Sequence, residues 1–100
     1  MANLGRDLRD TIRNLENIRD KQKPPGKEIL AQIDTLYGQQ IELVNAAINN
    51  ATVEYAAAAK AMKKAANQTK KAIDDLTKVE ETTAKVANAI KKVANLLAAV

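Results

Sequence analysis

An apolar stripe runs unbroken through almost two thirds of this chain, and it constrains the fold more than any other feature. Its members follow one another at steps of four and three residues in strict alternation, which gives a mean period of 3.5 residues. No Gly or Pro follows Gly38 to interrupt a helix. The stripe therefore predicts helices that pack along a heptad seam. Its members are Tyr37, Ile41, Val44, Ile48, Ala51, Tyr55, Ala58, Met62, Ala65, Thr69, Ala72, Leu76, Val79, Thr83, Val86, Ile90, Val93, Leu97 and Val100.

The composition indicates the same fold class. Nineteen of the 100 residues are Ala, and the only aromatic residues are Tyr37 and Tyr55. A β-sheet protein would need β-branched and aromatic residues in short runs separated by turns, and that pattern is missing. The length is that of one domain. We therefore predict a single all-α domain over residues 1–100.

The N-terminal segment carries an amphipathic stripe of its own. This stripe predicts a first helix over 4–22, with Asn3 or Asp7 at its N-terminus. Residues 23–26 follow, and their Pro-Pro-Gly sequence cannot continue the hydrogen-bond ladder, so we predict a sharp turn there. The members of the stripe are Leu4, Leu8, Thr11, Leu15, Ile18 and Gln22, and Ile12 widens it.

The remainder of the chain is too long for one unpaired helix. A helix over 27–100 would measure about 110 Å and would leave most of its seam in water. We predict a turn near 67–69, where Asn, Gln and Thr cluster, between a long helix over 27–66 and an antiparallel helix over 70–100. Residues 49–52 and the capping-box pattern at 77–80 are alternative turn positions.

The size of the seam residues varies along the chain. Leu, Ile and Val dominate in 4–18, 30–48 and 76–100, whereas 51–72 offers mainly Ala, Met and Thr. This difference predicts an antiparallel three-helix bundle at the base of a helical hairpin. The Ala-rich hairpin tip would then project about 25 Å beyond the base as two closely packed helices. Small side chains bury less apolar surface, so the tip is expected to open first.

Positive charge is concentrated near the middle of the chain. The net charge is +4, and five lysines with no acidic residue lie between Tyr55 and Ile73. Such a surface could bind an acidic protein or an anionic membrane, or could simply keep an Ala-rich helix solvated. Lys in place of Arg, without interleaved aromatic residues, argues against sequence-specific nucleic-acid binding. The predicted partner-binding residues are Lys60, Lys63, Lys64, Lys70 and Lys71.

Few residues are suited to catalysis. The chain has no Cys and no His, so it lacks the thiol nucleophile, the commonest general base and two common metal ligands. The acidic pairs at 74–75 and 80–81 consist of neighbours that point apart on a helix. We therefore expect no catalytic, cofactor or metal site, and a protein that is not an enzyme.

These features lead to one leading hypothesis and two alternatives. The leading hypothesis is a helical interaction protein that acts by self-association or by binding a protein partner. A secreted or membrane-surface hairpin is the first alternative, and its build is similar to that of small WXG-type secreted proteins, although their Trp-x-Gly motif is absent. The second alternative is a long coiled-coil dimer. Without an apolar run of about 18 residues or a signal-like N-terminus, we expect a cytoplasmic protein or export without a cleaved signal.

Overall fold

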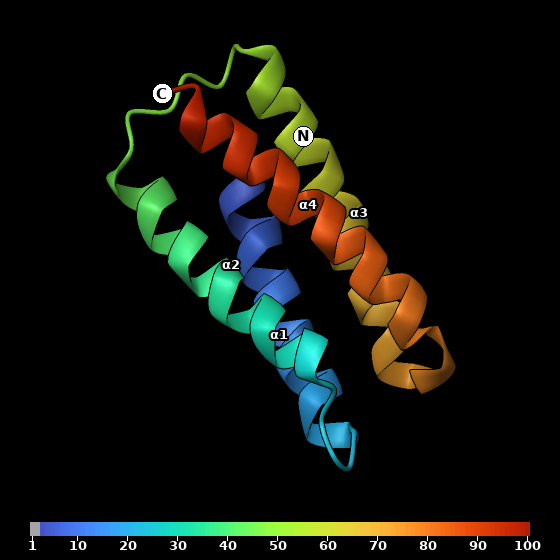
Figure 1. The fold of residues 1–100 in the computed structure, drawn as a ribbon. Coiled ribbons are helices and arrows are strands. Elements are labelled where there is room, and N and C mark those ends of the chain that lie inside the picture. The colour runs from blue at the N-terminus through green and yellow to red at the C-terminus, as the bar shows by residue number, and fades with distance from the viewer. Residues whose placement is uncertain (1–2) are drawn as a thin grey trace.

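Four α-helices make up the computed structural model, which describes residues 3–100 (Figure 1). No β-strand occurs within these residues, and the predicted all-α class is confirmed. The helices form a four-helix bundle that measures 40 × 22 × 18 Å. Their bounds are α1 Leu4–Lys21, α2 Lys27–Asn45, α3 Val53–Asp74 and α4 Val79–Ala98, with a short 3-10 helix η1 at Leu76–Lys78.

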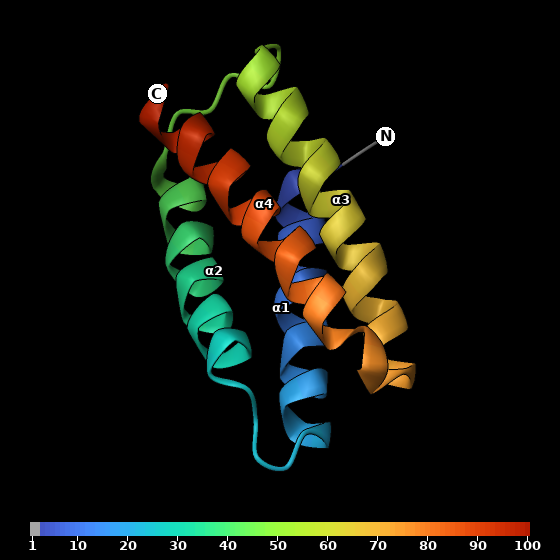
Figure 2. The same cartoon turned by 45° about the vertical axis from the view of Figure 1, so that its right-hand side comes forward.

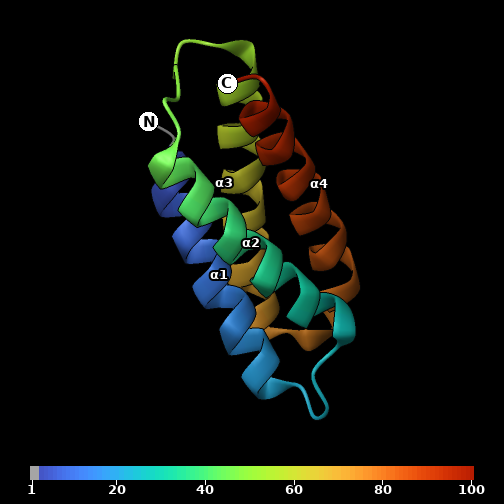
Figure 3. The same ribbon diagram turned by 60° about the vertical axis from the view of Figure 1, so that its left-hand side comes forward.

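The bundle consists of two antiparallel hairpins that lie side by side. Helices α1 and α2 form one hairpin, α3 and α4 form the other, and both hairpin turns lie at the same end (Figure 2). Helix α3 packs on α1 and α4, and α2 packs on the same two helices, so α2 and α3 occupy opposite corners. Residues 46–52 cross from α2 to α3 at the other end of the bundle (Figure 3).

The first helix and its turn match the prediction. The Asn3 Oδ1 accepts a 2.9 Å hydrogen bond from the Arg6 backbone N–H and so caps α1. After Lys21 the chain reverses through the Pro-Pro-Gly segment, where the Gly26 N–H donates to the Gln22 Oε1 at 3.1 Å. Asp7, the other candidate cap, lies inside α1 and is buried. Local signals were therefore sufficient to place this part of the chain.

The predicted long helix over 27–66 is wrong, and so is an unbroken helix over 27–100. Helix α2 ends at Asn45, and the chain is irregular until Val53. In this segment the Asn49 Oδ1 accepts from the Ala51 N–H at 2.9 Å, and the Thr52 Oγ1 caps α3 by accepting from the Tyr55 N–H at 3.2 Å. The Asn49 and Thr52 side chains thus accept from backbone N–H groups of the crossing segment and of the first turn of α3, so a new helix begins at Val53.

The predicted turn near 67–69, and with it the start of the last helix at 70, is also wrong. Residues 67–69 lie inside α3. There the Thr69 hydroxyl donates a hydrogen bond to the Ala65 carbonyl at 2.8 Å, so its hydrogen-bonding requirement is met within the helix and the helix continues. The chain reverses at 75–78 instead. There the Asp75 Oδ1 accepts from the Thr77 N–H at 3.1 Å and from its hydroxyl at 2.6 Å.

The predicted three-helix base with a projecting two-helix tip is wrong, because four helices run side by side within residues 3–100. The alanines of the predicted tip belong to α3, which lies between α1 and α4, and Ala58, Ala65 and Ala72 are fully buried. The break at 46–52 lets α3 return alongside α1, so the alanine face of α3 packs into the core of the bundle. Small side chains suit this position because they let two neighbouring helices approach the same helix closely.

The predicted heptad seam is buried only in part. Met62, Thr69, Val86 and Val93 are fully buried, but Tyr37, Ile41 and Val44 are exposed. Helix α2 buries a face other than the predicted seam. The break at 46–52 allows α2 to rotate about its own axis independently of α3. The buried residues of α2 are Ile29, Gln32, Ile33, Leu36 and Gln39.

Candidate functional site

The five predicted lysines share one face of α3. At 100° per residue they cover about a third of the helix circumference, directly opposite the buried face that includes Met62. All five are exposed, and they extend over about 16 Å of helix. We call Lys60, Lys63, Lys64, Lys70 and Lys71 the lysine surface.

The structure brings three of these lysines together. Lys60, Lys63 and Lys64 line a shallow hollow of about 640 Å³, with Asn50, Tyr55, Ala56, Ala59 and Asn67 as its other residues. Lys70 instead lines a groove of about 440 Å³ between α1 and α3, which also includes Asp7 and Asp10. Lys71 lines neither depression. The first three lysines therefore form the centre of the lysine surface.

The charge of the lysine surface is not paired within the described part of the chain. The ion pairs within 4.0 Å among residues 3–100 are Arg9–Asp10 and Arg19–Asp20, both on α1. The acidic residues of α3, Glu54 and Asp74, lie near its two ends. A row of positive charges is thus left free for an external anion.

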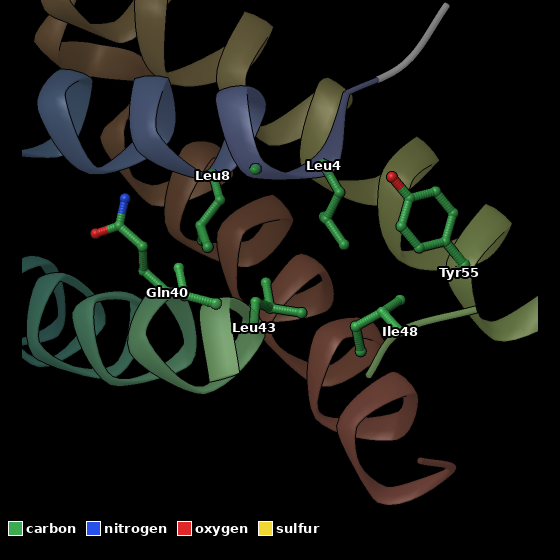
Figure 4. A pocket seen from close by; sticks show the side chains of 8 residues that line it. Leu4, Leu8, Gln40, Leu43, Ile48 and Tyr55 are labelled. Atoms are coloured by element: carbon green, nitrogen blue, oxygen red, sulfur yellow. The ribbon is translucent and has the colours of Figure 1, made fainter. Parts of the chain in front are cut away.

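An apolar cavity of about 300 Å³ lies at the end of the bundle where 46–52 crosses. Leu4 and Leu8 of α1 face Leu43 of α2 and Ile48 of the crossing segment, with Tyr55 of α3 at one side (Figure 4). The lining is mainly apolar, with Gln40 and Tyr55 as its polar residues, so the cavity can accept an apolar group. Sequence reasoning missed this cavity because it depends on the break after α2. The one available signal was Leu43, which lies outside the predicted seam.

Two groups have a shifted pKa, and a local hydrogen bond explains each shift. The Tyr37 hydroxyl donates to the Glu16 Oε2 at 3.0 Å, and this bond raises the pKa of Tyr37. The hydroxyl and the N–H of Thr77 both donate to Asp75 and lower the pKa of that carboxyl. Both groups belong to surface contacts and not to a pocket with convergent polar residues.

Acidic residues of the pairs at 74–75 and 80–81 lie at the N-termini of helices, where they have a structural role. Asp75 caps η1, and Glu80 and Glu81 are exposed in the first turn of α4, where a negative charge is favourable near the helix N-terminus. Within residues 3–100, no cluster of three or more acidic side chains has a geometry suited to a metal ion.

Two further findings bear on the function. None of the helices within residues 3–100 combines the length and the apolar character that crossing a bilayer requires. Comparison of the chain with protein-family models, with curated proteins and with solved structures finds no match. Its functional interpretation therefore depends on its own residues, of which the lysine surface is the most distinctive group.

Proposed function

We propose that this protein is a non-enzymatic interaction protein whose lysine surface binds an acidic partner protein. The observation that supports this proposal is the row of five exposed lysines on α3, none of which pairs with a carboxylate of residues 3–100. Such a surface attracts anions over about 8–10 Å at physiological ionic strength and speeds their encounter.

The residue types favour a protein partner over a nucleic acid. Lysine presents a compact charge on a flexible stem and lacks the rigid fork with which arginine reads phosphates and bases. Tyr55, the one aromatic residue of the hollow, is half-buried, so no row of rings is available for base stacking. The fixed spacing of Lys60, Lys64 and Lys71 suits an acidic helix whose carboxylates recur at four and seven residues.

An anionic membrane fits the lysine surface less well. A helix that lies on a membrane inserts a free apolar face between the lipid headgroups. The apolar face of α3 is instead buried against α1 and α4. Charge attraction alone would remain, and it would be weaker than attraction combined with insertion.

Charge reversal tests the proposal. Lys60→Glu, Lys63→Glu and Lys64→Glu are combined in one variant, and Lys78→Glu, Lys85→Glu and Lys91→Glu in a matched control with the same net charge. These control lysines are also exposed, but they lie on η1 and α4. Binding to poly-L-glutamate, measured by fluorescence anisotropy across a salt series, is expected to fall about tenfold more in the first variant than in the control.

Two outcomes would overturn the proposal. An equal loss in both variants would mean that net charge alone governs binding and that the lysine surface has no special role. Binding to vesicles with anionic lipid that exceeds binding to poly-L-glutamate, and that is lost in the α3 variant, would assign the surface to a membrane.

A further inference from the structure

A groove of about 440 Å³ between α1 and α3 is lined by charges of both signs. Asp7 and Asp10 lie on the first half of α1, whereas Arg13 lies further along α1 and Lys70 lies in the last two turns of α3. We call this depression the α1–α3 groove. The other residues that line it are Asn14, Asn17, Ala66 and Asn67.

The two helices run parallel along this groove. The Asn14 Nδ2 donates to the Ala66 carbonyl at 3.2 Å, and the Lys21 Nζ donates to the Ile73 carbonyl at 2.8 Å. Both bonds join residues 52 positions apart in the chain, so each residue of α1 lies level with the residue of α3 that follows 52 positions later. The carboxylates therefore lie toward one end of the groove and the cationic side chains toward the other.

Asp7 is the observation that points to a ligand. Only 8% of its surface is exposed, and it lines the groove. The Thr11 hydroxyl donates to its backbone carbonyl, but no group of residues 3–100 forms a hydrogen bond or an ion pair with its carboxylate. Charged side chains are almost never buried to this extent without a partner. The carboxylate is therefore available to a cationic group that enters the groove.

The other charged residues leave both ends of the groove open to a ligand. Asp10 lies 3.8 Å from Arg9, and both side chains are about half exposed, so this surface pair is weak. Arg13 and Lys70 are exposed, and neither lies within 4.0 Å of a carboxylate of residues 3–100. One end of the groove thus attracts a cation and the other end attracts an anion.

Three asparagines lie along the groove between its acidic and its cationic ends. The Asn14 Nδ2 donates to the Ala66 carbonyl and to the Thr69 hydroxyl, which leaves its Oδ1 as an acceptor. Asn17 and Asn67 are exposed, and their carboxamides can both donate and accept. A carboxamide has the same donor and acceptor as a peptide group, so these side chains suit a peptide backbone.

We propose that the α1–α3 groove binds a short peptide of about three residues with both termini free. Its ammonium group pairs with Asp7 and Asp10, and its carboxylate pairs with Arg13 and Lys70. At 1.5 Å per residue, the backbone of Arg13 lies about 9 Å beyond that of Asp7, and that of Lys70 about 16 Å beyond it. Side chains of a helix lean toward its N-terminus, which brings the long Lys70 side chain back toward Arg13.

The separation of the charges selects the length of the peptide. An extended chain spans at most about 3.3–3.6 Å per residue, so three residues span about 10 Å. A single amino acid is too short to reach both ends, and a simple amine or an inorganic anion would contact only one of them. The groove volume of about 440 Å³ lies within the range of about 300–1,000 Å³ that is usual for ligand pockets.

Titration of trialanine into the nitrogen-15-labelled protein, followed by two-dimensional NMR, tests the site. Salt is kept at about 20 mM because the proposed contacts are ionic. We expect saturable shifts of the backbone amides of 7–17 and 66–70 and of the side-chain amides of Asn17 and Asn67. The backbone amides of α2, which does not line the groove, should remain unchanged.

Two pairs of variants separate the groove from general charge effects. Asp7→Asn should weaken trialanine binding at least tenfold, whereas Asp34→Asn, which removes the same charge from an exposed position on α2, should change it less than about twofold. Lys70→Gln should weaken binding about fivefold. Lys71→Gln, at the next position but outside the groove, should leave binding unchanged.

A change in the ligand tests the same contact without altering the protein. N-acetyl-trialanine lacks the ammonium group, so the wild type should bind it at least tenfold less tightly than trialanine. Asp7→Asn should bind the two peptides nearly equally, because the ammonium has then lost its main partner. Circular dichroism measures the stability of Asp7→Asn, and the comparison of the two peptides on the wild type decides the proposal even where that stability changes.

Four results would overturn the proposal. These are the absence of saturable shifts with trialanine up to about 50 mM, equally tight binding of N-acetyl-trialanine, equal trialanine binding by Asp7→Asn and Asp34→Asn, and shifts confined to the amides around Lys60 and Lys64. Asp7→Asn and Asp34→Asn should bind poly-L-glutamate equally, because neither residue belongs to the lysine surface. Failure of peptide binding in the groove would therefore leave the proposed function unchanged.

Discussion

The side-chain Nε2 of Gln32 in α2 donates a 2.8 Å hydrogen bond to the backbone carbonyl of Thr83 in α4. One heptad further along both helices, the Nε2 of Gln39 donates to the carbonyl of Ile90 at 3.0 Å. Because donor and acceptor both advance by seven residues in the same direction, the two bonds set α2 and α4 parallel in one register. The two glutamines thus hold together the least closely packed pair of neighbouring helices in the bundle.

The same glutamines limit stability, because the Oε1 of each is buried without a partner. We expect the double variant Gln32→Leu/Gln39→Leu to raise the free energy of unfolding by about 1 kcal/mol. An unpaired buried oxygen costs about 1–3 kcal/mol, whereas each hydrogen bond contributes only about 1 kcal/mol. Urea unfolding measures the change. A variant less stable than the wild type would show that the two bonds outweigh the unpaired oxygens.

Asn14 links α1 to α3 through the Ala66 carbonyl at 3.2 Å and the Thr69 hydroxyl at 3.1 Å. We expect Asn14→Ala to lower the free energy of unfolding by about 1–2 kcal/mol, because it removes both bonds at a partly buried position. A double-mutant cycle with Thr69→Val measures the interaction free energy between the Asn14 and Thr69 side chains, for which we expect about 0.5–1.5 kcal/mol. Additive effects of the two substitutions would show that the Asn14–Thr69 bond contributes nothing to stability.

The alanine face of α3 should not tolerate larger side chains. Ala65 is fully buried between neighbouring helices, so Ala65→Leu is expected to lower the free energy of unfolding by about 1–3 kcal/mol through overpacking. Ala56→Leu is the matched control, because Ala56 is exposed on the same helix. Its effect should lie within about 0.5 kcal/mol. Equal thermal stability of the two variants would mean that close packing around α3 is not needed.

Amide hydrogen exchange should rank α3 above α2 in protection. The alanine segment 54–72, expected from its sequence to open first, belongs to a helix that packs more extensively on α1 and α4 than α2 does, and α2 also buries two glutamines. We expect amides of 58–69 to exchange only through global unfolding and those of 36–45 to exchange through local opening. More rapid exchange in 58–69 than in 36–45 would contradict this order.

Asp75 should make stability depend on pH in the acid range. Hydrogen bonds from Thr77 lower the pKa of this carboxyl in the folded protein, so folding favours its charged form. The stabilisation is therefore fully present above the unfolded-state pKa of about 4 and is lost as the pH falls through the lower folded-state pKa.

Asp75→Asn isolates this effect, because asparagine can still cap the helix but carries no charge. We expect its melting temperature to lie below that of the wild type at pH 7, and the difference to shrink as the pH falls through the folded-state pKa of Asp75. A difference that is constant across this range would mean that the charge of Asp75 does not contribute.

Several elements follow from the sequence because their causes are local. The 3.5-residue period predicts helices, and Pro24, Pro25 and Gly26 exclude any continuation of α1. The spacing of Lys60, Lys63 and Lys64 places them on one face of a helix, whereas Lys70 and Lys71 share that face only because α3 continues through the predicted turn at 67–69. Residues 49–52 and 77–80 were recognisable as alternative turn positions from their capping residues.

The tertiary structure decided which of those positions became turns and which faces became buried. Thr69 and Thr52 have the same hydroxyl, yet Thr69 bonds to its own helix and Thr52 ends the crossing segment. Local capping preferences differ by only about 1 kcal/mol, whereas each large apolar side chain that becomes buried contributes about 1.5–3 kcal/mol. The position of α3 against α1 and α4 buries its alanine face together with Leu, Ile and Val side chains of those helices. Packing therefore outweighed the local capping preferences and left Ile41 exposed.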